Sequence, residues 1–233
     1  MSAIEKSYAE ARKLFLPPFN EDANKPFRVY DSQEVAGEEA WAQISRVIDA
    51  CLHKGDEWKE ALQGKRQWPE SLRTMLDTVT NPTQKKGAKY QIKTMLLVHY
   101  LVRFHNRASK KFMDGSQEEM AKYLGLPREV SDRFLSLFCA PTHDKGRSGF
   151  ATTKQLKDRR VVYTLVMFLL AHGRDMKVGS IDKLCQDMRL EVKDAMNLYR
   201  EAGCTCIKSK AGMVSVSLKV PLEFPPPKRG KKT

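Results

Sequence analysis

The segment Lys154–Arg174 constrains the fold most, because it is a helix candidate with apolar residues on almost every side. After a basic entry it reads Val-Val-Tyr-Thr-Leu-Val-Met-Phe-Leu-Leu-Ala from Val161 to Ala171. A helix that is apolar all round is buried inside a globular unit. The elements that follow it must therefore cover this helix.

Two further helices and a hairpin are predicted after it. Ser180 is a good N-cap for the first of these helices, and Gly203 stands where a C-cap glycine ends the second. The predicted elements are the helices Ile181–Met188 and Glu191–Ala202 and the alternating runs Cys204–Lys208 and Met213–Lys219, joined by the turn Ser209–Gly212. Three helices followed by a hairpin are typical of a winged helix, in which the third helix faces the DNA major groove and the hairpin is the wing.

The preceding part of the chain repeats this order. Its predicted helices are Ala88–Asn106, a second opened by the capping box Ser116–Glu119, and a third from Pro127 to Phe138, followed by a polar segment over 142–149. Ser116 aligns with Ser180, and Phe104 aligns with Phe168 at the same offset along the chain. A tandem duplication explains this better than chance does.

Residues 1–84 lack that order. A charged helix over 2–15 ends at Pro17-Pro18, and an extended linker over 19–31 carries Phe19, Phe27 and Tyr30 as aromatic anchors. Helical patterns follow over 37–52, 57–62 and 68–79. They fit either a small helix-turn-helix or helices laid along a larger partner. Because apolar residues are sparse, we expect residues 1–60 to be mobile on their own.

The sequence therefore predicts a mainly α fold with short β-hairpins. Its predicted parts are a linker with a small helix-turn-helix over 1–84, winged helices over 85–152 and 153–222, and a basic disordered tail over 223–233. The turn-rich basic segment Asn81–Gly87 sets the first boundary.

Charge points to a polyanionic partner. The formal net charge is +13, distributed as −4 over residues 1–60, +8 over 61–150 and +9 over 151–233. Such an excess indicates nucleic acid. Solubility charge on helix faces is the plainer interpretation, but the basic residues fall in loops, wing positions and the tail more than in i,i+4 pairs.

The sequence disfavours a membrane protein, a secreted disulfide-bonded protein, a zinc protein and an enzyme. No apolar run reaches the roughly 18 residues of a membrane span, and the N-terminus has no apolar signal region. The 5 cysteines make no disulfide framework, which favours the nucleus or cytosol. Cys204 and Cys206 share a strand face near Cys185, but a zinc site lacks a fourth ligand. We predict no enzyme activity, no metal and no cofactor.

The candidate DNA-binding residues are basic or amide side chains at wings, helix starts and the last helix. They are Lys145, Arg147, Lys154, Lys157, Arg159, Arg160, Lys193, Asn197, Arg200, Lys208 and Lys210. Both predicted third helices also carry acids, which phosphates repel. We therefore expect salt-sensitive contact with the phosphate backbone rather than base readout.

Two alternatives remain open. Winged helices also serve as protein–protein scaffolds, which a DNA titration would distinguish. Single-strand binding requires exposed aromatic residues interleaved with basic loops, and that pattern is not evident here.

A family resemblance extends over nearly the whole chain. Leu16-Pro-Pro-Phe-Asn-Glu-Asp-Ala23, Tyr30-Asp31 and Glu39-Ala-Trp41 precede the predicted tandem winged helix. Together they resemble the C-terminal half of the larger subunit of the RNA polymerase I-specific heterodimer, the A-forty-nine type. There an extended linker crosses the polymerase cleft and leads to a tandem winged helix related to that of transcription factor IIE.

The resemblance implies a non-catalytic subunit region in the nucleus and nucleolus. It implies DNA binding, contact with the RNA polymerase I core through residues 1–84, and roles in initiation and elongation on ribosomal RNA genes. The family's N-terminal dimerisation barrel has no counterpart in this sequence. Binding of the smaller heterodimer subunit is therefore expected only where such a domain is present in the full protein.

Overall fold

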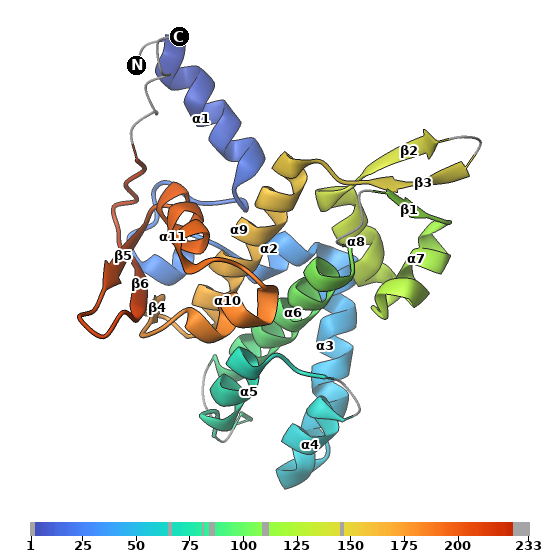
Figure 1. The fold of residues 1–233 in the computed structure, drawn as a ribbon. Coiled ribbons are helices and arrows are strands. Elements are labelled where there is room, and N and C mark those ends of the chain that lie inside the picture. The colour runs from blue at the N-terminus through green and yellow to red at the C-terminus, as the bar shows by residue number, and fades with distance from the viewer. Residues whose placement is uncertain are drawn as a thin grey trace.

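The protein is mainly helical, with two small antiparallel sheets, which confirms the predicted fold class (Figure 1). The computed structural model describes residues 3–64, 67–80, 82–83, 87–108, 112–144 and 147–225. The basic tail beyond Pro225 lies outside the described residues. No helix in the described ranges is long and apolar enough to cross a bilayer.

Two units share one order of elements. The first contains α6 (Ala88–Arg107), β1 (Phe112–Asp114), α7 (Gln117–Leu124), α8 (Arg128–Phe138), β2 (Ala140–Asp144) and β3 (Arg147–Ala151). The second contains α9 (Lys154–Ala171), β4 (Lys177–Val178), α10 (Asp182–Met188), α11 (Val192–Glu201), β5 (Cys204–Lys208) and β6 (Val214–Leu218). Their sheets have the matching strand orders β1-β3-β2 and β4-β6-β5.

The offset predicted from the sequence is kept along most of both units. Along the sequence, the first residues of α8 and α11 are separated by the same number of positions as Ser116 and Ser180. The first residues of β2 and β5 have this separation too. The two hairpins then diverge, since the separation between the starts of β3 and β6 is larger. The second hairpin therefore has the longer turn.

Local capping explains where the helices begin and end. Ser116 and Glu119 form the predicted capping box of α7. Helix α10 begins at Asp182, and its N-cap is Ile181, which makes no side-chain cap bond, so the prediction of Ser180 as the N-cap is wrong by one residue. The Ser180 hydroxyl still accepts from the Asp182 backbone N–H, at 3.2 Å. Gly203 has φ +80°, and a Cβ there would lie 2.6 Å from Leu222 Cδ1. Both the backbone conformation and the close approach require glycine at this position.

The helices α6 and α9 form the seam between the units (Figure 1). They run antiparallel, because the first turn of α6 meets the end of α9. There the Gln91 side chain donates to the Ala171 carbonyl at 2.9 Å. Phe138 of the first unit packs edge-on against Tyr163 of α9, with ring centroids 5.2 Å apart. The helix that the sequence predicts to be buried is the shared core of the molecule.

The N-terminal third is part of the same core. Its elements are α1 (Ala3–Phe15), α2 (Ser32–Ala36), α3 (Glu38–Leu52), α4 (Trp58–Gln63) and α5 (Glu70–Asp77), with 3-10 turns at Pro26–Arg28 and Gly55–Glu57. Helix α3 lies on α6 and α8, and α5 lies on α10. The hydroxyl of Tyr30 donates to the Ala202 carbonyl at 2.9 Å.

The structure therefore corrects the expected mobility of residues 1–60. Leu16, Val35, Ile44 and Ile48 are fully buried and belong to one hydrophobic cluster with both units. Two alternatives were predicted for residues 37–79. The structure is closer to the second, in which the helices are laid along a larger surface, but that surface belongs to their own chain. The boundaries at 84/85 and 152/153 stay predictions.

Candidate nucleic-acid interface

The predicted DNA-binding residues fall into separate places. Lys154, Lys157 and Arg159 lie at the start of α9, whereas Lys193, Asn197 and Arg200 lie on α11 beside the β5–β6 hairpin with Lys208 and Lys210. Lys145 lies outside the described residues, and only the backbone of Arg147, in β3, is described. In Figure 1 the two hairpins lie at opposite sides of the molecule, so the predicted residues do not form one continuous patch.

Arg160 is a correction to the predicted set. Its side chain is only 2% exposed, and its guanidinium donates to the Ala108 carbonyl at 3.1 Å. The guanidinium also lies over the Phe104 ring, 5.5 Å from its centroid. Burial lowers the pKa of Arg160 to about 10, so the group remains charged at neutral pH. Arg160 joins the two units and is not available to a phosphate.

The start of α9 keeps a smaller basic group. Thr153 caps the helix by accepting from the Leu156 N–H at 3.2 Å, and Lys154 is exposed next to that cap. Arg159 is half-buried and stacks on Tyr163, whose hydroxyl accepts from it at 3.2 Å. A helix start with basic side chains favours anions, but Arg159 is partly engaged within its own helix.

Helix α8, the third helix of the first unit, is engaged by its own chain. The Arg133 guanidinium donates to the carbonyls of Glu34 and Val35, each at 3.1 Å. On another stripe of the helix, Arg128 pairs with Asp132 at 3.7 Å. One face of α8 is therefore covered by α2 and α3, which reduces what this helix offers to DNA.

Helix α11, by contrast, exposes one long face. Only Ala195 and Tyr199 of this helix are buried. With about 3.6 residues per turn, Lys193, Asn197 and Arg200 share one stripe of its surface. Asp194 and Glu201 share the adjacent stripe, so the exposed face is divided into a basic half and an acidic half.

The basic half of α11 lies on the side of the hairpin. The Cys206 thiol of β5 contacts the Met196 carbonyl at 3.7 Å, and Met196 neighbours Lys193 and Arg200 at i,i+3 and i,i+4 spacing. Lys208 shares the strand face of Cys206, two residues further along β5. The predicted basic residues of helix and hairpin are therefore brought to one side.

The hairpin itself contains no acid. Between Glu201 and Glu223 the chain carries Lys208, Lys210 and Lys219 and no Asp or Glu. Lys177 of β4 is also exposed, and its register partner in β6 is Ser217. Sequence reasoning did not select Lys177 or Lys219, although the absence of acids over 202–222 was available as a signal.

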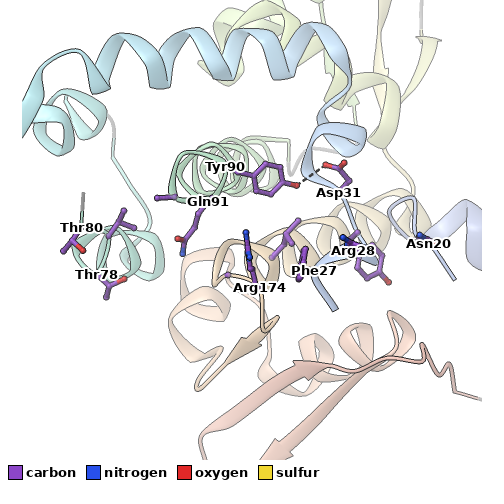
Figure 2. Close-up of a pocket in the computed structure, with 15 residues that line it drawn as sticks. Asn20, Phe27, Arg28, Asp31, Thr78, Thr80, Tyr90, Gln91 and Arg174 are labelled. Carbon is purple, nitrogen blue, oxygen red and sulfur yellow. Dashed lines mark hydrogen bonds between the residues drawn. The ribbon is translucent and has the colours of Figure 1, made fainter. Parts of the chain in front are cut away.

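A hollow of about 1000 Å³ lies where the 20–31 segment meets the ends of α6 and α9. Figure 2 shows the Tyr90 hydroxyl bonded to Asp31, at 3.0 Å. The guanidiniums of Arg28 and Arg174 lie 5.9 and 5.5 Å from the centroid of the Phe27 ring. Sequence reasoning found Phe27 as an anchor but had no signal that Arg174 would join it.

The cysteines behave as buried apolar residues. Burial raises the pKa of the Cys185 thiol to about 11, and burial raises that of Cys204 further. High thiol pKa values disfavour the thiolate that binds metals. Within the ranges that the structure describes, no group of three or more His, Cys, Asp or Glu side chains is arranged to hold a metal ion.

Fold and surface define a class of protein: two helical units with hairpins, joined through their first helices, with one acid-free basic hairpin. The chain belongs to a family that fits this class, the A49-like RNA polymerase I associated factors, whose model matches residues 2–225. A search of curated proteins returned no match.

The family resemblance seen in the sequence is thereby confirmed. Its restriction to the C-terminal half of the larger subunit stays a prediction. Membership makes this a factor associated with RNA polymerase I, which implies transcription and a nuclear location.

Proposed function

We propose that this protein is a non-catalytic region of an RNA polymerase I subunit that binds DNA largely without sequence preference. In this proposal the two units act as winged helices and the β5–β6 hairpin is the principal wing. The protein supports initiation and elongation on ribosomal RNA genes in the nucleolus.

One observation carries the proposal: the acid-free hairpin with Lys208, Lys210 and Lys219 lies beside the basic stripe of α11. Lysine and arginine side chains that neutralise phosphates supply sequence-independent affinity. The hydroxyls along the hairpin, such as Thr205 and Ser215, are further donors to phosphate oxygens.

Base-specific readout has less support. Asn197 is the amide on α11 suited to a base edge, and its Oδ1 accepts from the Arg200 guanidinium at 3.3 Å. Asp194 and Glu201 border the same face. One face of the corresponding helix of the first unit is covered by α3 and by the hydrogen bonds of Arg133 to α2.

Contact with the polymerase core is assigned to residues 1–84, and α1 offers exposed apolar side chains for it. Leu14 is 70% exposed and Tyr8 is 42% exposed on this helix. A helix of 13 residues is marginal in water without a packing partner. Replacing Leu14 and Tyr8 by Asp should reduce capture of polymerase subunits from nuclear extract while leaving DNA affinity unchanged.

The protein–protein scaffold remains the second candidate, and one observation favours it for the first unit. Arg133 of α8 binds the carbonyls of Glu34 and Val35 of the same chain, so the third helix of this unit makes intramolecular protein contact in place of DNA contact. The scaffold role and DNA binding by the second unit are compatible.

The experiment is fluorescence anisotropy on two duplexes of unrelated sequence over a series of salt concentrations. We expect similar micromolar affinities, with log K falling by about 0.9 per log unit of salt for each neutralised phosphate. Changing Lys208 and Lys210 to Glu should weaken both complexes alike and lower the slope by about two. The matched control reverses the charge of two other lysines, Lys6 and Lys13 on α1, by changing them to Glu. A salt-independent affinity, or none at all, overturns the proposal.

A further inference from the structure

Two apolar side chains are exposed at the outer end of the β5–β6 hairpin. Ile207 is 61% exposed and Met213 is 52% exposed. In a hairpin of alternating strands they lie on the same face, since Ile207 pairs with Ser215 and the Ser209 N–H donates to the Met213 carbonyl at 2.8 Å.

Their surroundings are those of a nucleic-acid contact rather than of a protein core. The opposite face of β6 is buried through Val214, Val216 and Leu218, so Ile207 and Met213 are not needed to cover the unit. Lys208 and Lys210 lie between the two residues in the sequence, and no acid occurs from 202 to 222. Single exposed apolar residues need no explanation, but a pair set among lysines and hydroxyls does.

The first hairpin provides an internal comparison. At the offset that relates β2 to β5, Ile207 corresponds to His143, whose ring nitrogen bonds the Ser148 hydroxyl at 2.9 Å. The first hairpin thus has a hydrogen-bonded polar pair at this position, whereas the second hairpin exposes an isoleucine. The exposed isoleucine at this position is therefore specific to the second hairpin.

We propose that the end of the β5–β6 hairpin enters the minor groove of duplex DNA and places Ile207 and Met213 against a base step, which it opens. Lys210 in the turn, and Lys208 on the opposite face of β5 from Ile207, then lie against the flanking phosphates. This inference rests on the proposed DNA binding. It adds that the hairpin binds in the minor groove, that Ile207 and Met213 contact the bases, and that the duplex is deformed at that step.

The physical basis is the apolar wedge. Isoleucine and methionine inserted between base pairs from the minor groove unstack a step and bend the duplex toward the major groove. Unstacking is easiest at pyrimidine–purine steps such as TpA. Binding should therefore favour duplexes with central TpA steps over duplexes with stiff A-tracts, without recognition of a longer sequence.

The test compares the full chain with Ile207→Ser/Met213→Ser and with Lys208→Glu/Lys210→Glu. Both changes are at exposed positions, so thermal unfolding should be unaltered. Removing the apolar pair should weaken binding about tenfold without changing the salt slope, because apolar contact releases no counterions. The Lys208→Glu/Lys210→Glu variant should instead lower the slope of log K against log salt. The matched control is Leu14→Ser, an exposed apolar side chain on α1.

Deformation is read directly with two probes on a duplex of about three helical turns. A 2-aminopurine at the central TpA step should brighten on binding, and energy transfer between end labels should rise as the duplex bends. Both signals should be lost in Ile207→Ser/Met213→Ser and kept in the control. Netropsin, which fills the minor groove, should compete with the wild-type chain.

The outcomes separate this inference from the proposed function. If the wild-type chain binds no duplex, both fail. If it binds, but the apolar double variant binds equally and the probes do not respond, the wedge is wrong and DNA binding stands. If that variant loses polymerase capture instead of DNA affinity, the pair contacts a protein, which also overturns the wedge.

Discussion

The Arg160 guanidinium donates to the carbonyl of Ala108, the residue that ends α6, at 3.1 Å. This bond joins α9 to the negative end of α6 across the seam between the units. Replacing Arg160 by Met keeps much of the side chain's volume but removes the donor and leaves a buried carbonyl unpaired. We expect a loss of about 1–3 kcal/mol in the free energy of unfolding. Urea unfolding followed by circular dichroism measures this.

The same variant tests the corrected assignment of Arg160. Its folded form should bind duplex DNA with unchanged affinity and unchanged salt slope. Arg159→Met, the neighbouring half-exposed arginine, is the control and should change stability much less. A lowered salt slope in Arg160→Met would return this residue to the DNA interface.

Asp187 is expected to hold α5 against the second unit. Its carboxylate accepts from the backbone N–H groups of Glu70 and Ser71 at 3.1 and 2.9 Å, and from the Ser71 hydroxyl at 2.6 Å. Asp187→Ala should destabilise the protein by about 1–2 kcal/mol, as the loss of an N-cap does. Hydrogen exchange should become faster over residues 70–77 in particular.

Asp175→Ala, an exposed acid in the loop before β4, is the control. If Asp187→Ala leaves exchange in α5 as slow as in the wild type, α5 is held by its apolar contacts and by the Lys183 ammonium, which donates to Glu70 and Thr74. The prediction would then be wrong.

Much of the fold could be predicted from local signals. The capping box at Ser116 and the glycine at position 203 mark helix ends by chemistry within a few residues. The strands β1 and β4 were not predicted, because such short segments do not show alternation. Helix α2, also very short, was missed for the same reason.

The packing of the N-terminal third could not be predicted. It depends on contacts between distant residues, such as Arg133 with the Glu34 carbonyl, 99 positions apart. A carbonyl acceptor has no side-chain identity, so no residue pattern marks it.

The candidate site shows the same limit. Arg159 and Arg160 are adjacent and chemically identical, but one is half-exposed and the other is buried. Helix α9 is apolar all round after residue 160, so periodicity gives no face by which to separate them. The two strands of the β5–β6 hairpin, in contrast, were predicted directly from alternation, β5 with its observed bounds and β6 one residue too long at each end.

Acid should destabilise the protein through His105. Burial, assisted by the Arg160 charge and opposed by a hydrogen bond to the Met188 backbone, lowers the pKa of His105 to about 4. The unfolded chain, with an ordinary histidine pKa near 6.5, binds a proton first as the pH falls. The stability that His105 contributes is therefore complete above pH 6.5 and is lost between pH 6.5 and 4, by about 3 kcal/mol at most.

Urea unfolding at a series of pH values measures this slope. His105→Gln should flatten the curve between pH 6.5 and 4, whereas His143→Gln, at an exposed position, should leave it unchanged. Burial also lowers the pKa of His172, so part of the slope should remain in the His105 variant. An unaltered slope in His105→Gln would show that its charge is not excluded from the folded state.

The two stripes of α11 should respond unequally to charge reversal. Lys193 shares its stripe with Arg200 on the side of the hairpin, where phosphates would lie, whereas Asp194 faces the adjacent side. Lys193→Glu should weaken duplex binding several-fold and lower the salt slope by about one, because a phosphate contact is lost. Asp194→Lys should strengthen binding by less than Lys193→Glu weakens it, since an exposed charge outside the contact acts through screened solvent.

Both residues are exposed in the same helix, so the thermal stability of each variant is measured as a control. Anisotropy at low and physiological salt decides the matter: if Asp194→Lys has the larger effect, DNA lies on the acidic side of α11 and the hairpin is not its neighbour.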